Sequence, residues 1–446
     1  MRRPRYSSSW QSKRKSWLRN TLLLILIGLP LLLILAELIA RGAILATGSN
    51  NALVPNKNVA IAQSYAFKLQ DSNGNAYPGL SDSGLLQVKR SPLLGYELMP
   101  SQSSEYWQIN DQGFRQDSSV PIIKPANEIR VFLVGGSTAF TDMAEKNQKA
   151  LAFKMEKLLN DRVRAQNANP EKFKPKETPF FADQVEAMQA LPARIQDGSY
   201  RVIAAAVPGY SSGNELALLA HRVMAYNPNA LVVLDGYEDL RSPSDQNARE
   251  IGNIEQMLRD PIAQYRQHQS QLFSNWLSSF YLVKAWQKWV VPVSAANFNS
   301  DYQIFNTEQF SKDPQELKKR VDRYLYNTQQ MTRLASGIPS LIVLQPEITG
   351  KQNLTKEEEE ILKSLGKEYR DRISNAYKVA EQTLNESAVK PKFVNFYQLF
   401  QGTNQQSFID PIHLTEAAND LLAQKLYENI ERLFLVQPAP NTQNPA

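Results

Sequence analysis

The stretch "EIRVFLVGGSTAF", residues 128–140, is the part of the sequence that best defines the fold. The apolar residues from Val131 to Val134 follow one another without the polar alternation of a half-exposed strand. Such a run is typical of a strand buried on both faces, as in a parallel sheet. Gly135 and Gly136 end the run, and "EKNQKALAFKMEKLLNDRV" (145–163) continues with helical spacing. The segment therefore predicts a strand, a tight turn and a helix, in that order.

The same order recurs along the chain. Four further segments each begin with a short apolar strand: "YRVIAAAVPGYSSGNELALLAHRVMAYNP" (200–228), "ALVVLDGYEDL" (230–240), "SLIVLQPEITG" (340–350) and "KFVNFYQLF" (392–400). Strands that alternate with helices predict an α/β fold, in which a parallel sheet carries helices on both faces. In such sheets ligands bind at the carboxyl ends of the strands, where these turns are expected to lie.

Residues suited to nucleophilic catalysis stand at these strand ends. His413, in "FIDPIHLTEAAND" (408–420), is one of only three histidines, and Asp410 precedes it by three positions. At that spacing the carboxylate can hold one ring nitrogen and leave the other for a substrate. Ser137 follows the Gly-Gly turn at the start of an expected helix and is the strongest candidate for a nucleophile that needs such a base. The backbone N–H groups of Ser137 and Gly209 are placed to bind an oxyanion.

Four of these motifs together resemble the sequence blocks of the SGNH hydrolases, also called GDSL esterases and lipases. The blocks are "VGGSTAF" (134–140), "VPGYSSGNE" (207–215), "LDGYEDL" (234–240) and "DPIHLT" (410–415). Upstream, "LGYELMP" (94–100) and "INDQGFR" (109–115) resemble an arm that precedes the serine block in membrane-anchored bacterial members. The resemblance covers roughly residues 91–435 and is weakest across 243–335.

The resemblance implies a fold and a set of roles. The fold would be a three-layer α/β/α sandwich with a short parallel sheet of the flavodoxin-like kind, within residues 126–435. Ser137 would be the nucleophile, His413 the base and Asp410 the group that orients the base. Gly209 would donate its N–H group to the oxyanion.

One position departs from the family pattern. Where the third block normally has an asparagine that donates to the oxyanion, this chain has Glu238. An ionised glutamate donates no hydrogen bond, and loss of one such donor costs about 2.7–4 kcal/mol of transition-state stabilisation. Three interpretations follow: a protonated Glu238 is itself the donor, Glu238 points away while Asn214 or a water takes its place, or ester cleavage is weakened or lost.

Composition excludes several other kinds of site. The chain has no cysteine, so disulfides, thiol catalysis and cysteine-ligated zinc are excluded. His221, His268 and His413 are scattered and form no metal-ligand pair, so we predict no metal. "GGST" lacks the lysine of a P-loop and the full dinucleotide fingerprint, so we predict no cofactor. The net charge of +6 comes from the first twenty residues, so a nucleic-acid groove is not expected.

The amino-terminal region predicts a membrane anchor. A basic tail, residues 1–20, leads into "TLLLILIGLPLLLILAELIARG" (21–42), in which the uncharged run ends at Glu37. About 20 apolar residues span a bilayer, and basic residues before the span favour a cytoplasmic amino terminus. We therefore expect a single transmembrane helix over residues 21–41, with the body on the extracytoplasmic (periplasmic) side of the cell membrane. The alternative is a cleaved signal peptide, although no A-x-A site ends the run.

Three other regions are assigned by composition. Residues 42–125 are expected to form an irregular stalk, up to about residue 90, and then an arm of short strands and turns packed on the body. Residues 243–335 are expected to be a helical insertion, whose aromatic part (271–293) is a lid, a membrane-resting segment or an ordinary helix pair. Residues 436–446 are expected to be a disordered tail.

These observations predict a membrane-anchored serine esterase of the SGNH type. Its expected partners are the lipid bilayer and an O-acylated glycan or lipid. Two alternatives remain: a catalytically weakened binding or assembly protein at the membrane, and an O-acyltransferase that uses the same triad. The acyl group, the acceptor and the oligomeric state do not follow from the sequence.

Overall fold

The computed structural model describes residues 24–47, 57–71, 73–75, 84–251 and 307–440, with scattered positions between 262 and 283. The chain divides into two compact units, one of residues 1–60 and 255–297 and the other of residues 61–254 and 298–446. We call the second the main unit. Every residue of the candidate site belongs to it.

Five parallel strands form the central sheet of the main unit. In sheet order they are β11 (Phe393–Asn395), β10 (Ser340–Leu344), β9 (Ala230–Asp235), β6 (Glu128–Gly135) and β8 (Ser199–Ala206). Each strand matches, to within one residue, the apolar start of one of the five segments that predicted it. β9 and β10 are buried along their whole length, which explains why their sequences show no polar alternation. The predicted α/β fold with a parallel sheet is confirmed.

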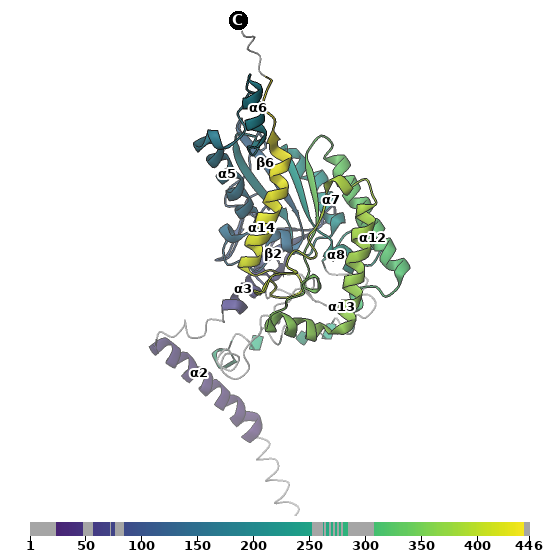
Figure 1. The fold of residues 1–446 in the computed structure, drawn as a ribbon. Coiled ribbons are helices and arrows are strands. Elements are labelled where there is room, and N and C mark those ends of the chain that lie inside the picture. Colours follow the sequence, from purple (N-terminus) through teal and green to yellow (C-terminus); the bar gives the residue numbers. More distant parts are fainter. Residues whose placement is uncertain are drawn as a thin grey trace, which may run out of the picture. The chain divides into compact units, whose positions relative to one another are not determined.

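Helices cover both faces of this sheet (Figure 1). α5 (Leu151–Ala168) connects β6 to β8, and α7 (Ser212–His221) connects β8 to β9. Because these two connections cross the sheet in opposite directions, right-handed crossovers place α5 and α7 on opposite faces. α14 (Glu416–Ile430) packs against α5, whereas α12 (Pro314–Leu334) packs against α7. The sheet is thus the middle of three layers.

The strand order places the predicted nucleophile at the point where the connections of the sheet change direction. Numbered along the chain, the five strands follow the order 2-1-3-4-5, in which neighbouring strands 1 and 3 are β6 and β9. The connections that leave these two strands run in opposite directions, and ligands bind at the carboxyl ends where this happens. Gly135 of β6 pairs with Leu234 of β9 at that end. The segments that carry Ser137 and Glu238 begin immediately beyond this pair.

Four further helices and two antiparallel strand pairs belong to the main unit. The other helices are α4 (Ser137–Phe140), α6 (Ala182–Gln189), α8 (Tyr237–Arg241) and α13 (Lys356–Asn385), which packs on α12. Antiparallel pairs join β4 (Gln102–Ser103) to β5 (Gln108–Ile109) and β7 (Arg194–Ile195) to β12 (Leu435–Val436).

The arm before the sheet is more regular than predicted. α3 (Lys57–Tyr65) is followed by a three-stranded sheet of β1 (Phe67–Leu69), β2 (Leu86–Ser91) and β3 (Gly95–Leu98). The prediction of an irregular stalk up to about residue 90 is therefore wrong for these residues. β1 and β2 show period-two burial over only a few residues, because Phe67, Leu69, Leu86 and Val88 face the core. An alternation over so few residues is difficult to recognise in a sequence with many polar neighbours.

The expected insertion 243–335 is also too long. α12 lies within that range but packs against α7, α8 and α13 of the main unit. Leu317, Val321, Tyr324 and Met331 form its buried stripe. Most of the aromatic part of the expected insertion, 271–293, lies outside the described residues.

The amino-terminal unit contains η1 (Leu24–Gly28) and α2 (Leu29–Thr47). Within this unit the Glu37 carboxylate accepts hydrogen bonds from the backbone N–H groups of Tyr281 and Leu282. In the described part of the chain, no helix combines the length and hydropathy needed to cross a bilayer. Residues 1–23, which hold the basic tail and the start of the expected anchor, lie outside the described residues.

The carboxyl-terminal segment is partly ordered. Ala439 exchanges backbone hydrogen bonds with Lys176 and Thr178, both 2.8 Å long. The expected disorder of residues 436–446 therefore does not hold for residues 436–440, and residues 441–446 lie outside the described part.

Candidate active site

Ser137 is the second residue after the carboxyl end of β6, and Gly136 lies between them. A Cβ atom on Gly135 would lie 2.2 Å from the carbonyl oxygen of Leu234, so only glycine lets the strand end this close to β9. Ser137 begins α4 and is only 3% exposed. α4 has four residues, and the long helix expected after the turn begins only at Leu151. The helix-dipole contribution predicted for Ser137 is correspondingly small.

The loop before α14 joins Asp410 to His413. Asp410 Oδ1 accepts the backbone N–H groups of Ile412 at 3.0 Å and of His413 at 2.8 Å. Asp410 Oδ2 lies 2.5 Å from Nδ1 of His413. One carboxylate therefore shapes the loop and holds the ring, which is the geometry that the three-residue spacing predicts.

The pKa of Asp410 reflects this bonding. Burial pushes the pKa of the carboxyl up, but the charge of His413 and the hydrogen bonds from His413 and Ile412 outweigh burial and lower it. Asp410 therefore stays ionised at neutral pH. An ionised carboxylate at Nδ1 keeps a proton on that nitrogen, so Nε2 is the unprotonated nitrogen when the ring is neutral.

A buried ion pair anchors the same loop. Glu358 Oε1 accepts the backbone N–H groups of Ser407 and Phe408 at 2.8 and 3.0 Å. Its Oε2 atom lies 2.6 Å from Nζ of Lys351, and both side chains are fully buried. The loop that carries His413 is thus held at its start by α13 and at its end by α14.

The serine turn and the histidine loop lie next to each other. Oγ1 of Thr138 donates to the carbonyl oxygen of Ile412 at 3.5 Å, and Nε2 of Gln345 donates to the same Oγ1 at 3.0 Å. Thr138 follows Ser137 and Ile412 precedes His413. The structure therefore brings together two blocks that are more than 270 residues apart in the sequence.

A further carboxylate, which the sequence reasoning missed, belongs to this site. Oδ2 of Asp142 lies 3.5 Å from Nε2 of His413. The His413 side chain is 2% exposed and that of Asp142 is fully buried. His413 thus has a carboxylate at each ring nitrogen.

Asp142 stands in a strained turn. Thr141 and Met143, on either side of it, both adopt left-handed backbone conformations, with φ of 65° and 66°. Non-glycine residues rarely adopt this region, and each such residue costs about 1–3 kcal/mol. No sequence signal marks a turn of this kind, because neither threonine nor methionine favours it.

The predicted oxyanion donor lies in a tight turn after β8. The N–H group of Tyr210 donates to the carbonyl oxygen of Val207 at 3.1 Å, with Pro208 and Gly209 between them. Gly209 has a φ of 76°, which completes a type II turn that requires glycine at this position. Within the described part of the chain the Gly209 N–H group forms no hydrogen bond. A Cβ atom on Gly136 would lie 3.1 Å from the carbonyl oxygen of Tyr210, so this turn and the serine turn are in contact.

Glu238 is held by two arginines. Its Oε2 atom lies 2.9 Å from Nη2 of Arg241 and 3.7 Å from Nη1 of Arg249. Glu238 and Arg241 are buried, with side-chain exposures of 6% and 0%. Two guanidinium groups therefore face the Glu238 carboxylate and compensate its charge.

The side chain of Asn214 is used in hydrogen bonds to other residues. Its Nδ2 atom donates to the carbonyl oxygens of Leu94 and Arg249, both at 2.8 Å. Its Oδ1 atom accepts the backbone N–H groups of Ser211 and Arg249. Asn214 therefore ties α7 to the arm, and the hypothesis that it replaces the missing oxyanion donor is wrong.

Replacing Glu238 by glutamine is expected to lower the free energy of unfolding by about 2 kcal/mol, because it leaves the charge of buried Arg241 without its carboxylate. Denaturant titration followed by circular dichroism measures this loss. The matched control is Glu308→Gln, whose 73%-exposed side chain pairs with Arg372 and should have an effect near zero. A more stable Glu238→Gln chain would show that the ion pair is not needed.

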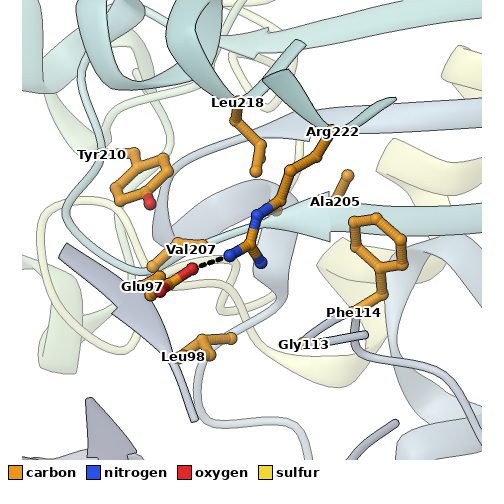
Figure 2. Close-up of a pocket in the computed structure, with 10 residues that line it drawn as sticks. Glu97, Leu98, Gly113, Phe114, Ala205, Val207, Tyr210, Leu218 and Arg222 are labelled. Carbon is orange, nitrogen blue, oxygen red and sulfur yellow. Dashed lines mark hydrogen bonds and ion pairs between the residues drawn. The ribbon is translucent and has the colours of Figure 1, made fainter. Parts of the chain in front are cut away.

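A small pocket lies beside the Gly209 turn (Figure 2). Val207 and Tyr210 of that turn line it, and Arg222 of the segment after α7 forms an ion pair there with Glu97 of β3. Neither Ser137 nor His413 is among its lining residues. The candidate nucleophile and the candidate base therefore do not line this pocket.

The chain has two further histidines, and the sequence predicts no metal site. His221 is exposed at the end of α7, and His268 lies outside the described residues. Among the residues that the structure describes, no group of three or more histidine, aspartate or glutamate side chains is placed to hold a metal ion.

Comparisons with known proteins find similarity to solved structures only. No family model and no curated protein matches the sequence. Among solved structures, the acetyl xylan esterase AlAXEase is 11% identical, with 68% of this chain and 100% of that chain covered and a TM-score of 0.33. A lipase/acylhydrolase from Enterococcus faecalis is 13% identical, with coverage of 70% and 98% and a TM-score of 0.33. A GDSL-like lipase from Bacteroides thetaiotaomicron is 12% identical, with coverage of 68% and 88% and a TM-score of 0.29. The chain is thus similar, at low identity, to esterases and lipases of known structure.

Proposed function

We propose that this chain is a serine esterase of the SGNH type in which Ser137 is the nucleophile, His413 the base and Asp410 the residue that orients the base. The observation that carries the proposal is the contact between Thr138 and Ile412, which sets the serine turn beside a histidine already held by Asp410. A hydroxyl, an imidazole and a carboxylate in this order form the relay that activates a serine.

The proposed reaction has two halves. His413 takes the Ser137 proton through Nε2 as the hydroxyl oxygen attacks the ester carbonyl, and it later gives that proton to the leaving alcohol. A water then attacks the acyl-serine by the same route and releases the acid. The N–H groups of Ser137 and Gly209 would bind the oxyanion of each tetrahedral intermediate.

The substrate class and location are part of the proposal. An ester of an O-acylated glycan or lipid would suit a catalytic unit held at the membrane by residues 21–41, on the extracytoplasmic side. Support comes from the sequence alone, namely the basic tail, the apolar run after it and the resemblance of the arm to that of membrane-anchored family members.

A second candidate is a catalytically weakened relative that binds an acylated glycan or lipid. The observation that favours it is Glu238, which stands where the family has an oxyanion donor and is bound to Arg241 and Arg249. An acyltransferase would use the same triad and differ only in passing the acyl group to a sugar hydroxyl.

The proposed function is tested with the full-length chain and a small chromogenic ester such as p-nitrophenyl acetate. We expect saturable release of nitrophenol that stops after treatment with a serine-directed fluorophosphonate. Addition of sugar alcohols as acceptors separates the activities, because a transferase forms sugar ester and a hydrolase forms free acid. A folded chain that neither releases nitrophenol nor transfers acetate would favour the binding protein.

A further inference from the structure

Asp142 is in a position that the proposed reaction does not use. In the relay, Nε2 of His413 has to face the Ser137 hydroxyl, yet Oδ2 of Asp142 lies 3.5 Å from this nitrogen. Oδ2 of Asp410 lies 2.5 Å from Nδ1 on the other side of the ring. A neutral imidazole carries one N–H group and can satisfy only one of these two acceptors. Both carboxylates can accept a hydrogen bond from the ring only when each ring nitrogen carries a proton.

The turn that holds Asp142 is fixed from several sides. The backbone N–H group of Asp142 donates to the carbonyl oxygen of Ser137 at 3.1 Å. Nη1 of Arg115 donates to the carbonyl oxygens of Phe140 and Thr141 at 2.7 and 2.9 Å. The Tyr65 hydroxyl donates to the carbonyl oxygen of Ala144 at 2.7 Å. The left-handed conformations on either side of Asp142 are therefore imposed by the surrounding structure, as expected where strain serves a function.

We propose that Asp142 is a positioning residue that holds the Nε2 side of His413 and keeps the imidazole doubly protonated in the resting site. The His413 imidazole then holds one proton more than the neutral ring that acts as a general base. Ser137 is activated only after this proton has left or after a substrate has displaced the Asp142 carboxylate. The role of Asp142 in catalysis rests on the proposed function, whereas its effect on the imidazole does not.

The charges around the ring agree with this proposal. Burial pushes the pKa of His413 down, but Asp410 and Asp142 together outweigh burial and raise it to about 10. Arg115 faces the same turn from the arm, and burial raises the pKa of Tyr65, which lies near both Arg115 and Asp142, to about 12. Outside the turn, Lys149 is paired with Glu145 and with Glu416 at the start of α14.

The raised pKa of His413 links the proposal to stability. The ordinary pKa of 6.5 applies to the unfolded chain, so the folded chain holds an extra proton between about pH 6.5 and about pH 10. The stabilisation is therefore fully present below about pH 6.5 and is lost as the pH rises through about 10. We expect the difference in free energy of unfolding between the wild-type chain and Asp142→Asn to shrink over this range, as measured by urea unfolding at several pH values. A difference that stays constant with pH would show that Asp142 acts only through packing.

Histidine NMR tests the proposal directly. Because the chain has three histidines, ¹³C labelling of the imidazoles gives at most three signals, and the one lost in His413→Gln belongs to His413. In the full-length chain we expect this signal to titrate near pH 10, and in Asp142→Asn we expect its midpoint to be lower by about one to three pH units. Asp420→Asn is the control, because Asp420 is exposed and pairs with Lys154 instead.

The outcomes separate this proposal from the proposed function. An unchanged His413 midpoint in a folded Asp142→Asn chain overturns the role of Asp142, whether or not the chain cleaves esters. A lower midpoint without hydrolysis in either chain supports that role and counts against the esterase. If both hold, the rising limb of the pH–rate profile should move to lower pH by the same amount as the NMR midpoint. Asp142→Ser, read by the same titration, replaces Asp142→Asn if the asparagine variant does not fold.

Discussion

Replacing Ser137 by alanine or His413 by glutamine is expected to lower the rate of ester hydrolysis about ten-thousandfold to a millionfold. In the proposed mechanism, either change removes a partner from the proton transfer that turns a hydroxyl into a nucleophile. Because the two residues act as one unit, the double variant should lose little more than either single variant. The measurement is kcat/KM for p-nitrophenyl acetate at alkaline pH, where His413 loses its extra proton.

The matched controls are Ser364→Ala on α13 and His221→Gln on α7, since both side chains are exposed. They should retain wild-type kcat/KM. Additive losses in the Ser137 and His413 variants, or losses below tenfold, would mean that the two residues do not share one chemical step.

Replacing Arg115 by methionine is expected to lower the free energy of unfolding by about 5 kcal/mol. The guanidinium is completely buried and donates to Asn147 Oδ1, the carbonyl oxygens of Phe140 and Thr141, and the Tyr65 hydroxyl. Each buried acceptor left without a donor costs about 1–3 kcal/mol. Methionine fills much of the same volume, so the loss reports hydrogen bonds and charge more than packing.

The effect should reach the active site, because Arg115 holds the two residues that precede Asp142. Urea unfolding gives the loss of stability, and ¹³C-histidine NMR should show a changed midpoint for His413. Arg164→Met, at a side chain that is 68% exposed, is the control and should change neither quantity. A stable Arg115→Met chain with an unchanged His413 midpoint would contradict this account of the arm.

The sheet was predictable because its strands are buried on both faces. Val131 to Val134 in β6 and the apolar run of β9 carry that burial in their own sequences, and a glycine turn follows each. The pairing of Asp410 with His413 was predictable for a similar reason, since it is contained within four residues. Ser137 and Gly209 were found because the turns that present them require glycine.

The features that escaped prediction depend on partners far away in the sequence. Asp142 faces His413 across 271 positions, in a turn whose left-handed residues, Thr141 and Met143, give no warning of it. Arg115 was assigned only to an arm packed on the body, whereas its hydrogen bonds to Phe140 and Thr141 show that it supports the turn before Asp142.

Glu238 was recognised as a departure from the family pattern, but its arginine partners were not. Arg241 stands one turn later on α8, and Arg249 follows in the segment after that helix. Both guanidinium groups compensate the charge of Glu238. A comparison with the family at this one position does not reveal these partners. The ion pairs with Arg241 and Arg249 explain how the Glu238 carboxylate is tolerated at a buried position.

The most direct test of the central claim is to treat the full-length chain with a fluorophosphonate and to locate the adduct by peptide mass spectrometry. The account predicts one phosphonylated residue, Ser137, with labelling that becomes faster as the pH rises toward 10 and is absent in His413→Gln. Labelling of another serine, or equal labelling of Ser137 with and without His413, would contradict the proposal that these side chains work together.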